Sequence, residues 1–187
     1  KALKEQYPDL VANYYRWDGI TSNVSKGNKV FREGLQVGDS TILTMYGFEL
    51  AYGDKRTAFD KPFSVVITED KAKKYFGKTD VVGETITIEN FSGARQDFMI
   101  TGIMKQPRRN SVLYITDDNN NQFYLAEKDL TWFSRDMNTW QNQYIAGYIE
   151  LQKGITAKDL ETPFQQLLKT HAAPDVAANL KPFIVPL

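Results

Sequence analysis

The amino-acid sequence predicts an α+β fold made of short helices and antiparallel hairpins. Three observations lead to this class. Segments 12–37 and 85–104 each hold two β-rich runs separated by turn residues. The stretch 64–77, SVVITEDKAKKYFG, joins a β-branched strand to an amphipathic helix. Residues 156–171 have the apolar periodicity of a second amphipathic helix.

The N-terminal part begins with a short predicted helix over residues 2–10, ending near Pro8. From Val11 onward the pattern is rich in aromatic residues and typical of a strand. The turn signal Lys26-Gly27-Asn28 then predicts a long hairpin over residues 12–37.

A helix and a short strand follow the hairpin. Asp39 is expected to cap a helix over residues 42–46, which Gly47 ends. The alternation of apolar and other residues at 48–52 predicts a short strand before Gly53.

The stretch 64–77 is the most compact folding unit of the sequence. A buried strand is expected at its start, and Thr68 is placed to cap the helix that follows. Ala72, Tyr75 and Phe76 share one face of this helix, so Phe76 is expected to be buried. Gly77 can supply the left-handed residue that ends it.

The second half of the chain predicts a mixture of elements. Strands over 85–89 and 97–104 form a hairpin in which Gly102 marks a bulge or a close approach. Residues 125–137 are either helical or irregular, and 144–151 read as a strand. Residues 116–122 are a polar loop.

The last helix has two candidate starts, the capping boxes Thr156/Asp159 and Thr162/Gln165. Pro163 is expected to break or kink it. Residues 180–185 are predicted to form a final strand.

Composition limits the function classes. The chain has 187 residues, enough for one domain or two small subdomains. Basic and acidic residues number 23 each, and a net charge of zero disfavours nucleic acid as a partner. The absence of cysteine excludes disulfides, thiol nucleophiles and thiolate metal sites. No apolar run is long enough to span a membrane. Because the sequence starts at Lys1, we expect it to be a processed or excised piece.

No catalytic constellation stands out, so the sequence does not predict an enzyme. His171 is the one histidine, and its place near a helix end favours a structural role. Glu69 and Asp70 are explained by the preference for acidic residues in a first helical turn. No phosphate loop, dinucleotide fingerprint or nucleophile elbow is present.

Neither a metal nor a cofactor is expected. Asp117, Asn119 and Asn121 imitate the first ligands of a calcium loop. The pattern then fails, because Gln122 replaces the required glycine and Glu127 falls one position early, with Lys128 in its place.

Two groups of residues are candidates for contact with a partner. Lys105, Arg108 and Arg109 form a basic cluster suited to an acidic partner or a lipid headgroup. Trp132, Phe133 and Trp140 lie in a segment without clean periodicity. Such aromatics are either core residues or an exposed binding patch.

The order of several motifs resembles the extracytoplasmic core domain of MacB/FtsX-type ABC transporter permeases. The most specific match is Pro62–Gly77, PFSVVITEDKAKKYFG. Other matching landmarks are Asp39, Leu43, Phe48, Leu50, Gly53-Asp54, Asp80, Gly83, Ile86, Ile88, residues 100–111 (ITGIMKQPRRNS) and residues 179–187 (NLKPFIVPL). Glu84, Gln106 and Val185-Pro186 depart from the family pattern.

This resemblance implies a non-enzymatic domain on the outer face of the inner membrane, anchored between two transmembrane helices. A separate cytoplasmic ATPase and a second permease subunit would be partners through the parent protein. Periplasmic or outer-membrane proteins, peptides or lipoproteins would be contacted outside. The resemblance also implies two lobes, one from residues 1–61 and 108–187 and one inserted at 62–107. The inserted stretch reads as a self-contained unit of helix and hairpin.

Two other functions stay open at the level of sequence. One is a free-standing extracellular module that binds peptide or glycan through the aromatic segment. The other is a hydrolase built on carboxylates, which would need two such groups converging in a pocket. Membrane helices on both sides of the chain would favour the permease, and a signal peptide alone would favour the free module.

Overall fold

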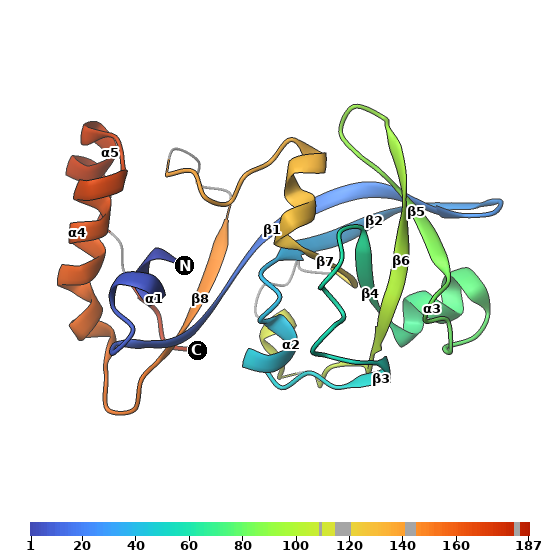
Figure 1. Cartoon of the computed structure of the whole chain (residues 1–187), viewed down its shortest axis with the longest axis horizontal. Coiled ribbons are helices and arrows are strands. Elements are labelled where there is room, and N and C mark those ends of the chain that lie inside the picture. Colours follow the sequence, from blue (N-terminus) through green and yellow to red (C-terminus); the bar gives the residue numbers. More distant parts are fainter. Residues whose placement is uncertain (109, 115–120, 141–144, 182–183) are drawn as a thin grey trace.

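A computed structural model describes residues 1–108, 110–114, 121–140, 145–181 and 184–187 (Figure 1). In chain order the elements are α1 (Ala2–Gln6), β1 (Val11–Lys26), β2 (Lys29–Gly38), α2 (Ile42–Met45), β3 (Leu50–Gly53), β4 (Ser64–Thr68), α3 (Glu69–Phe76), β5 (Thr85–Glu89), β6 (Arg95–Met104), η1 (Val112–Tyr114), β7 (Phe123–Ala126), η2 (Glu127–Phe133), β8 (Ala146–Leu151), η3 (Ala157–Leu160), α4 (Glu161–His171) and α5 (Pro174–Asn179). Those labelled η are 3-10 helices. Within these ranges no helix is both long and apolar enough to cross a membrane.

Six strands close into a barrel. Their order is β1, β2, β7, β4, β6, β5 and back to β1. The pairs β2–β7 and β4–β6 are parallel, and the other four are antiparallel. The ring closes where Val24 and Ser25 of β1 pair with Ile88 and Thr87 of β5. Closure leaves most strand edges paired, which protects the backbone from pairing with other chains.

The barrel interior holds the main core. We call this set the barrel cluster, and its strand residues are Ile20, Val24, Leu35, Val37, Val65, Ile67, Ile86, Ile88, Phe98, Ile100, Ile103, Phe123 and Leu125. Alternate positions such as Leu35 and Val37 point inward, as the pleat of a strand requires. Helix α3 adds Ala72 and Tyr75, and η2 adds Leu130 and other residues. A second cluster, which includes Ile42 and Leu43 of α2, covers other strand residues such as Val66 and Tyr124.

A third, smaller cluster joins the two ends of the chain. The chain-end cluster consists of buried Leu3, Val11, Leu160 and Leu167 with partly buried neighbours that include Ile184. Figure 1 shows α1, α4 and α5 gathered beside β8, with both termini close to them. Strand β1 joins this region to the barrel: Val11–Trp17 pairs with β8, and Trp17–Lys26 pairs with β2.

Most predicted elements are confirmed. The hairpin over 12–37 is β1–β2, and the 85–104 hairpin is β5–β6. Thr68 caps α3 through its side chain, and Gly77 ends it with a φ of 76°. The Thr156/Asp159 capping box is also present. The register of β4 against β6 shifts beside Gly102, as the sequence predicted.

Four expectations need correction. Thr41 rather than Asp39 is the N-cap of α2, because the Asp39 carboxylate is engaged by Arg16. Phe76 is only partly buried and packs beneath the ammonium of Lys26, 5.0 Å from its ring centroid. Among residues 180, 181 and 184–187 there is no strand, and helix α5 precedes them. The helix break lies before Pro163, where η3 passes into α4 at Leu160.

The proposed lobes share a continuous sheet. Strands β4, β5 and β6 lie within residues 62–107, yet they pair with β7 and β1 from outside that stretch. Their apolar side chains also meet those of β1, β2 and β7 in the barrel cluster. The lobe boundaries therefore stay a prediction. Because the two proposed lobes share the strand pairs of one barrel, motion of one lobe relative to the other is limited by those pairs.

Candidate functional site

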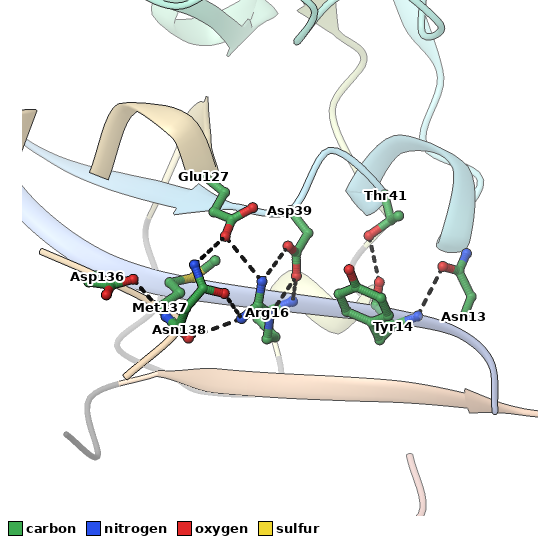
Figure 2. A network of polar contacts seen from close by, with 9 residues as sticks. All are labelled: Asn13, Tyr14, Arg16, Asp39, Thr41, Glu127, Asp136, Met137 and Asn138. Atoms are coloured by element: carbon green, nitrogen blue, oxygen red, sulfur yellow. Dashed lines mark hydrogen bonds and ion pairs between the residues drawn. The ribbon is translucent and has the colours of Figure 1, made fainter. Parts of the chain in front are cut away.

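The junction between the barrel and the chain-end cluster holds a polar network centred on Arg16 (Figure 2). Arg16 lies on β1 one residue before the strand changes its partner from β8 to β2. Its Nε and Nη2 donate to the two carboxylate oxygens of Asp39 at 3.0 and 2.9 Å. The Arg16 backbone N–H donates to the same carboxylate at 2.8 Å. Such bidentate pairing fixes both position and orientation.

The guanidinium also holds two further segments. Nη1 donates to the Met137 carbonyl at 3.0 Å and to Asn138 Oδ1 at 3.4 Å. Nη2 donates to Glu127 Oε1 at 3.3 Å, and Asn138 Nδ2 donates to the same oxygen at 3.3 Å. One side chain therefore ties β1 to the end of β2, the start of η2 and the segment after it, as Figure 2 shows.

The charges of the network are shielded from water. The side chains of Arg16 and Asp39 are 14% and 7% exposed. Burial works to lower the pKa of Arg16, but the hydrogen bonds and charge of Asp39 outweigh it and raise that pKa. The guanidinium therefore stays charged, and its partners would be left buried without it.

Close backbone packing supports the same junction. An added Cβ on Gly38 would lie 2.4 Å from the Arg16 carbonyl oxygen and 2.9 Å from Trp17 Cβ. Thr41, at the start of α2, donates to the Tyr14 carbonyl at 2.6 Å. These contacts hold the end of β2 and α2 against β1, so the junction has little freedom to slide.

An open groove lies next to the network. Its volume is about 570 Å³, and its walls come from α1, β1, β8, α4 and residues 137–140. Much of the lining is apolar or aromatic, including Leu3, Tyr14, Trp140, Tyr148 and Leu168. Trp140 stacks on His171 with ring centroids 5.1 Å apart. Such a concave, largely apolar surface suits an apolar side chain of a ligand or partner.

The predicted aromatic residues do not form one exposed patch. Phe133 is 1% exposed and belongs to the barrel cluster, and Trp132 is partly buried against the same cluster. Trp132 packs between Phe63, Phe98 and Phe133, with centroids 4.7–6.4 Å apart. Only Trp140 among the three lines the groove. The core interpretation thus holds for Trp132 and Phe133.

The predicted basic cluster lies elsewhere. Lys105 and Arg108 line a separate hollow of about 570 Å³ near the start of β3. The ammonium of Lys105 is 2.7 Å from Glu49 Oε2, and both side chains are exposed. Arg109 lies outside the described residues. Lys105 is thus partly neutralised, which leaves Arg108 as the more available cation of the two.

The remaining sequence candidates are spread over the fold, and the exposed His171 also lines the groove. His171 is in the last turn of α4, with Nε2 3.3 Å from Gln6 Nε2. Glu69 and Asp70 lie in the first turn of α3. Asp117 and Asn119 of the calcium-like loop lie outside the described residues, and Glu127 belongs to the Arg16 network. Across the described ranges no group of three or more histidine or acidic side chains could hold a metal ion.

Sequence reasoning missed Arg16 because a lone arginine inside a predicted strand carries no motif. Its partner Asp39 was singled out, but for helix capping. Only the fold brings β1, β2 and η2 together, and the residues involved are 23 and 111 positions apart in the chain.

Three solved structures share this fold. A domain of a protein described as a permease from Porphyromonas gingivalis gives a TM-score of 0.71 at 21% identity, covering 94% of this chain and 70% of that one. The extracellular domain of the noncanonic ABC-type transporter YknZ from Gram-positive bacteria gives 0.65 at 12% identity, covering 100% and 87%. The periplasmic region of MacB from Actinobacillus actinomycetemcomitans gives 0.64 at 15% identity, covering 90% and 71%.

The comparison with curated protein sequences finds no match. In the comparison with protein families, residues 1–167 match the MacB-like periplasmic core domain. That match spans most of the chain, and the structural neighbours are periplasmic or extracellular domains of the same kind. The chain therefore belongs to the family of MacB-like periplasmic core domains.

Proposed function

We propose that this chain is the extracytoplasmic domain of an ABC transporter permease at the periplasmic face of the inner membrane. In this proposal it couples ATP-driven motion of the transmembrane helices to cargo or partner proteins outside the membrane. The domain itself is not an enzyme. ATP hydrolysis belongs to a cytoplasmic ATPase that works with this permease and a second permease subunit.

The single observation that carries the proposal is the joining of the two chain ends in one cluster. Leu3 near the N-terminus and Ile184 near the C-terminus both pack in the chain-end cluster. A domain inserted between two membrane helices would receive motion through both ends together. Because the two ends share apolar contacts, they would move as one body.

Strand β1 offers a path for that motion. It leaves the chain-end cluster at Val11, enters the barrel at Trp17 and ends at Lys26. Sixteen residues in extended conformation span about 50 Å, so one strand reaches across much of the domain. The Arg16 network braces β1 where its pairing partner changes. β1 pairs first with β8 and then with β2 along almost its whole length, and a paired strand resists bending better than a loop does.

Cargo or partner contact is proposed for the surfaces that remain available. Trp140 lines the groove beside the chain-end cluster, where motion would first arrive. Lys105 and Arg108 line the separate hollow near β3. An aromatic side chain in a groove is a common binding anchor.

The coupling can be tested by measuring nucleotide-dependent movement. In the full permease with its ATPase, a spin label at Asn28→Cys reports the distance between the hairpin tips of two permease subunits. This domain has no cysteine of its own, so a label can be placed at one site once other cysteines of the parent are replaced. We expect different distance distributions for the nucleotide-free and ATP-trapped states.

Two further measurements complete the test. A label at Lys153→Cys, just after β8 and the chain-end residue Leu151, is the control for movement near the membrane. Identical tip distances in every nucleotide state, with ATP hydrolysis intact, would contradict coupling.

The isolated chain is expected to show no ATP hydrolysis and no thermal shift with nucleotides. Turnover by this chain alone would overturn the non-catalytic assignment.

A further inference from the structure

Charge is unevenly distributed, although the chain as a whole is neutral. Residues 26–33 and 71–78 carry seven basic side chains and one acidic side chain. The first stretch is the β1–β2 hairpin tip, and the second is most of α3 with the residues just after it. Figure 1 places both at the end of the barrel away from the two termini. The remainder of the chain therefore carries the compensating negative charge.

Direct contacts join the two stretches into one surface, which we call the basic tip. Lys29 Nζ donates to the carbonyls of Lys74 and Tyr75 at 2.8 and 3.0 Å, at the C-terminal end of α3. Cations favour this position because the helix dipole is negative there. Glu33 of β2 in turn accepts from Lys74 at 2.7 Å and from Lys71.

Two carboxylates pair with residues of the basic tip, Glu33 from within it and Glu84, which lies 3.3 Å from Lys26 Nζ, and they do not neutralise its seven basic side chains. Glu33 is 6% exposed and pairs with both Lys71 and Lys74, so this buried group keeps a net positive charge. Burial works to raise the pKa of Glu33, but the two lysines and the Tyr75 hydroxyl lower it below its usual value. Within the described ranges, Arg32, Lys73 and Lys78 form no ion pair with a carboxylate, and all three are exposed.

Apolar side chains are exposed among these charges. Val30 and Phe31 are 59% and 39% exposed at the hairpin tip. Phe31 is nevertheless held in place: its ring meets Tyr75 edge to face with centroids 5.6 Å apart, and Lys74 Nζ lies 3.8 Å from its centroid. A fixed aromatic side chain loses little conformational entropy when a partner covers it.

Protection of the strand edge does not explain this composition. Lysines on an open edge do discourage pairing with other chains, and β2 pairs with β7 only from Leu35 onward. A protected edge, however, avoids exposed apolar residues, and two are present here. Among the residues that the structure describes, Arg32, Lys73 and Lys78 also have no acidic partner, which suits a surface that receives its negative charge from another molecule.

We propose that the basic tip is a docking surface for an acidic, extended polypeptide segment that places an apolar side chain against Phe31 and Val30. The carboxylates of the segment would pair with Arg32, Lys73 and Lys78. A protein partner fits better than a lipid surface, because Phe31 packs against Tyr75 and Lys74 instead of projecting freely. This inference concerns binding by the chain itself and does not rest on the proposed coupling.

The test uses this chain and a labelled peptide of alternating glutamate and leucine. Binding is followed by fluorescence anisotropy at low and at high salt. We expect binding that weakens with salt and that is lost when the glutamates of the peptide are replaced by glutamine. Failure of the wild-type chain to bind the peptide at low salt would overturn the proposal.

Variants locate the site. The triple variant Arg32→Glu, Lys73→Glu, Lys78→Glu reverses three exposed charges and should weaken binding roughly tenfold or more. Phe31→Ala should weaken it roughly fivefold. The matched control Lys153→Glu, Lys158→Glu, Lys169→Glu reverses three exposed charges near the chain-end cluster. It changes the net charge of the chain by the same amount as the first triple variant, so it should weaken binding less than that variant does. Equal losses in both triple variants would contradict a localised site.

A vesicle-binding assay distinguishes a protein partner from a lipid surface. Co-sedimentation with phosphatidylcholine vesicles, with and without phosphatidylglycerol, should show little recruitment at physiological salt. Recruitment to anionic vesicles without peptide binding would overturn the proposal in favour of a lipid surface. Circular dichroism and thermal unfolding of each variant confirm that a loss of binding is not a loss of fold.

Discussion

Removing Arg16 should destabilise the fold mainly because its partner Asp39 stays buried without a cation. Arg16→Met should lower the free energy of unfolding by roughly 2–4 kcal/mol, because the nearly buried Asp39 carboxylate is left without its cation. The matched control is Arg56→Met, since Arg56 pairs with Asp54 at 2.7 Å but is 86% exposed. That variant should leave stability nearly unchanged, because an exposed ion pair contributes little. Urea unfolding of both variants makes the comparison, and equal effects would contradict a special role for the Arg16 network.

Asp129 is a residue whose charge opposes folding. It is 2% exposed, and burial raises the pKa of its carboxyl to about 6, although Phe63 N–H donates to Oδ1 at 2.9 Å. Between about pH 4 and pH 6 the folded state binds the proton more tightly than the unfolded state. The contribution of Asp129 to the free energy of unfolding therefore falls as pH rises through this range.

Asp129→Asn tests this sign. Asparagine keeps an acceptor for Phe63 N–H and carries no charge, so stability at pH 7 should rise by about 1–2 kcal/mol. The contribution of Asp129 to the pH dependence between about pH 4 and 6 should disappear. The exposed residue Asp9 provides the control for the loss of one negative charge, because Asp9→Asn should not stabilise the fold at pH 7 as Asp129→Asn does. A wild-type pH profile in Asp129→Asn would show that its carboxyl does not titrate there.

At the scale of elements, local signals predicted local structure. The strand and helix at 64–77 were predicted with their cap and stop, because each signal lies within a few residues of the place where it acts. Strand β7 was missed, since its four residues are buried on both faces and pair with the distant strands β2 and β4. Phe76 was misplaced because the helical face could not reveal Lys26 from another strand above its ring.

Gly38 tests the packing of β2 against β1. Gly38→Ala should destabilise the fold by roughly 1–3 kcal/mol, because its Cβ would lie 2.4 Å from the Arg16 carbonyl oxygen and force the strands apart. Gly147, on the opposite neighbour β8, is the matched control: its added Cβ would meet Arg16 Cγ at an ordinary 3.9 Å. Gly147→Ala should be close to neutral in thermal unfolding. A reversed order of the two variants would show that the junction is not closely packed.

At the scale of the whole molecule, the sequence predicted the class and the family but not the closed ring. Barrel closure depends on the short β1–β5 and β4–β7 pairings, and neither follows from any one segment. The same limit applies to the candidate sites. A net charge of zero concealed the basic tip, because Lys29 and Lys74 become neighbours only when α3 packs against the hairpin. Local patterns likewise could not show that Phe133 faces the barrel interior.

The chain-end cluster and the barrel should differ in local stability. The chain-end cluster has four buried members, whereas the barrel cluster draws on six strands, so the former opens at a lower free energy. Leu167→Ala removes a side chain that is 1% exposed and should cost roughly 2–4 kcal/mol. Amide hydrogen exchange should accelerate in α1, β8 and α4, while β4, β5 and β6 keep their protection.

Ile100→Ala, in the barrel cluster, is the counterpart that should accelerate exchange throughout the barrel. In the full permease, Leu167→Ala should lower transport or partner response for each ATP hydrolysed, because the chain ends would no longer move as one body. Uniform acceleration of exchange across all strands in Leu167→Ala would mean that both clusters unfold as a single unit. Motion would then have to pass through the whole domain at once, and a path along β1 would not be needed.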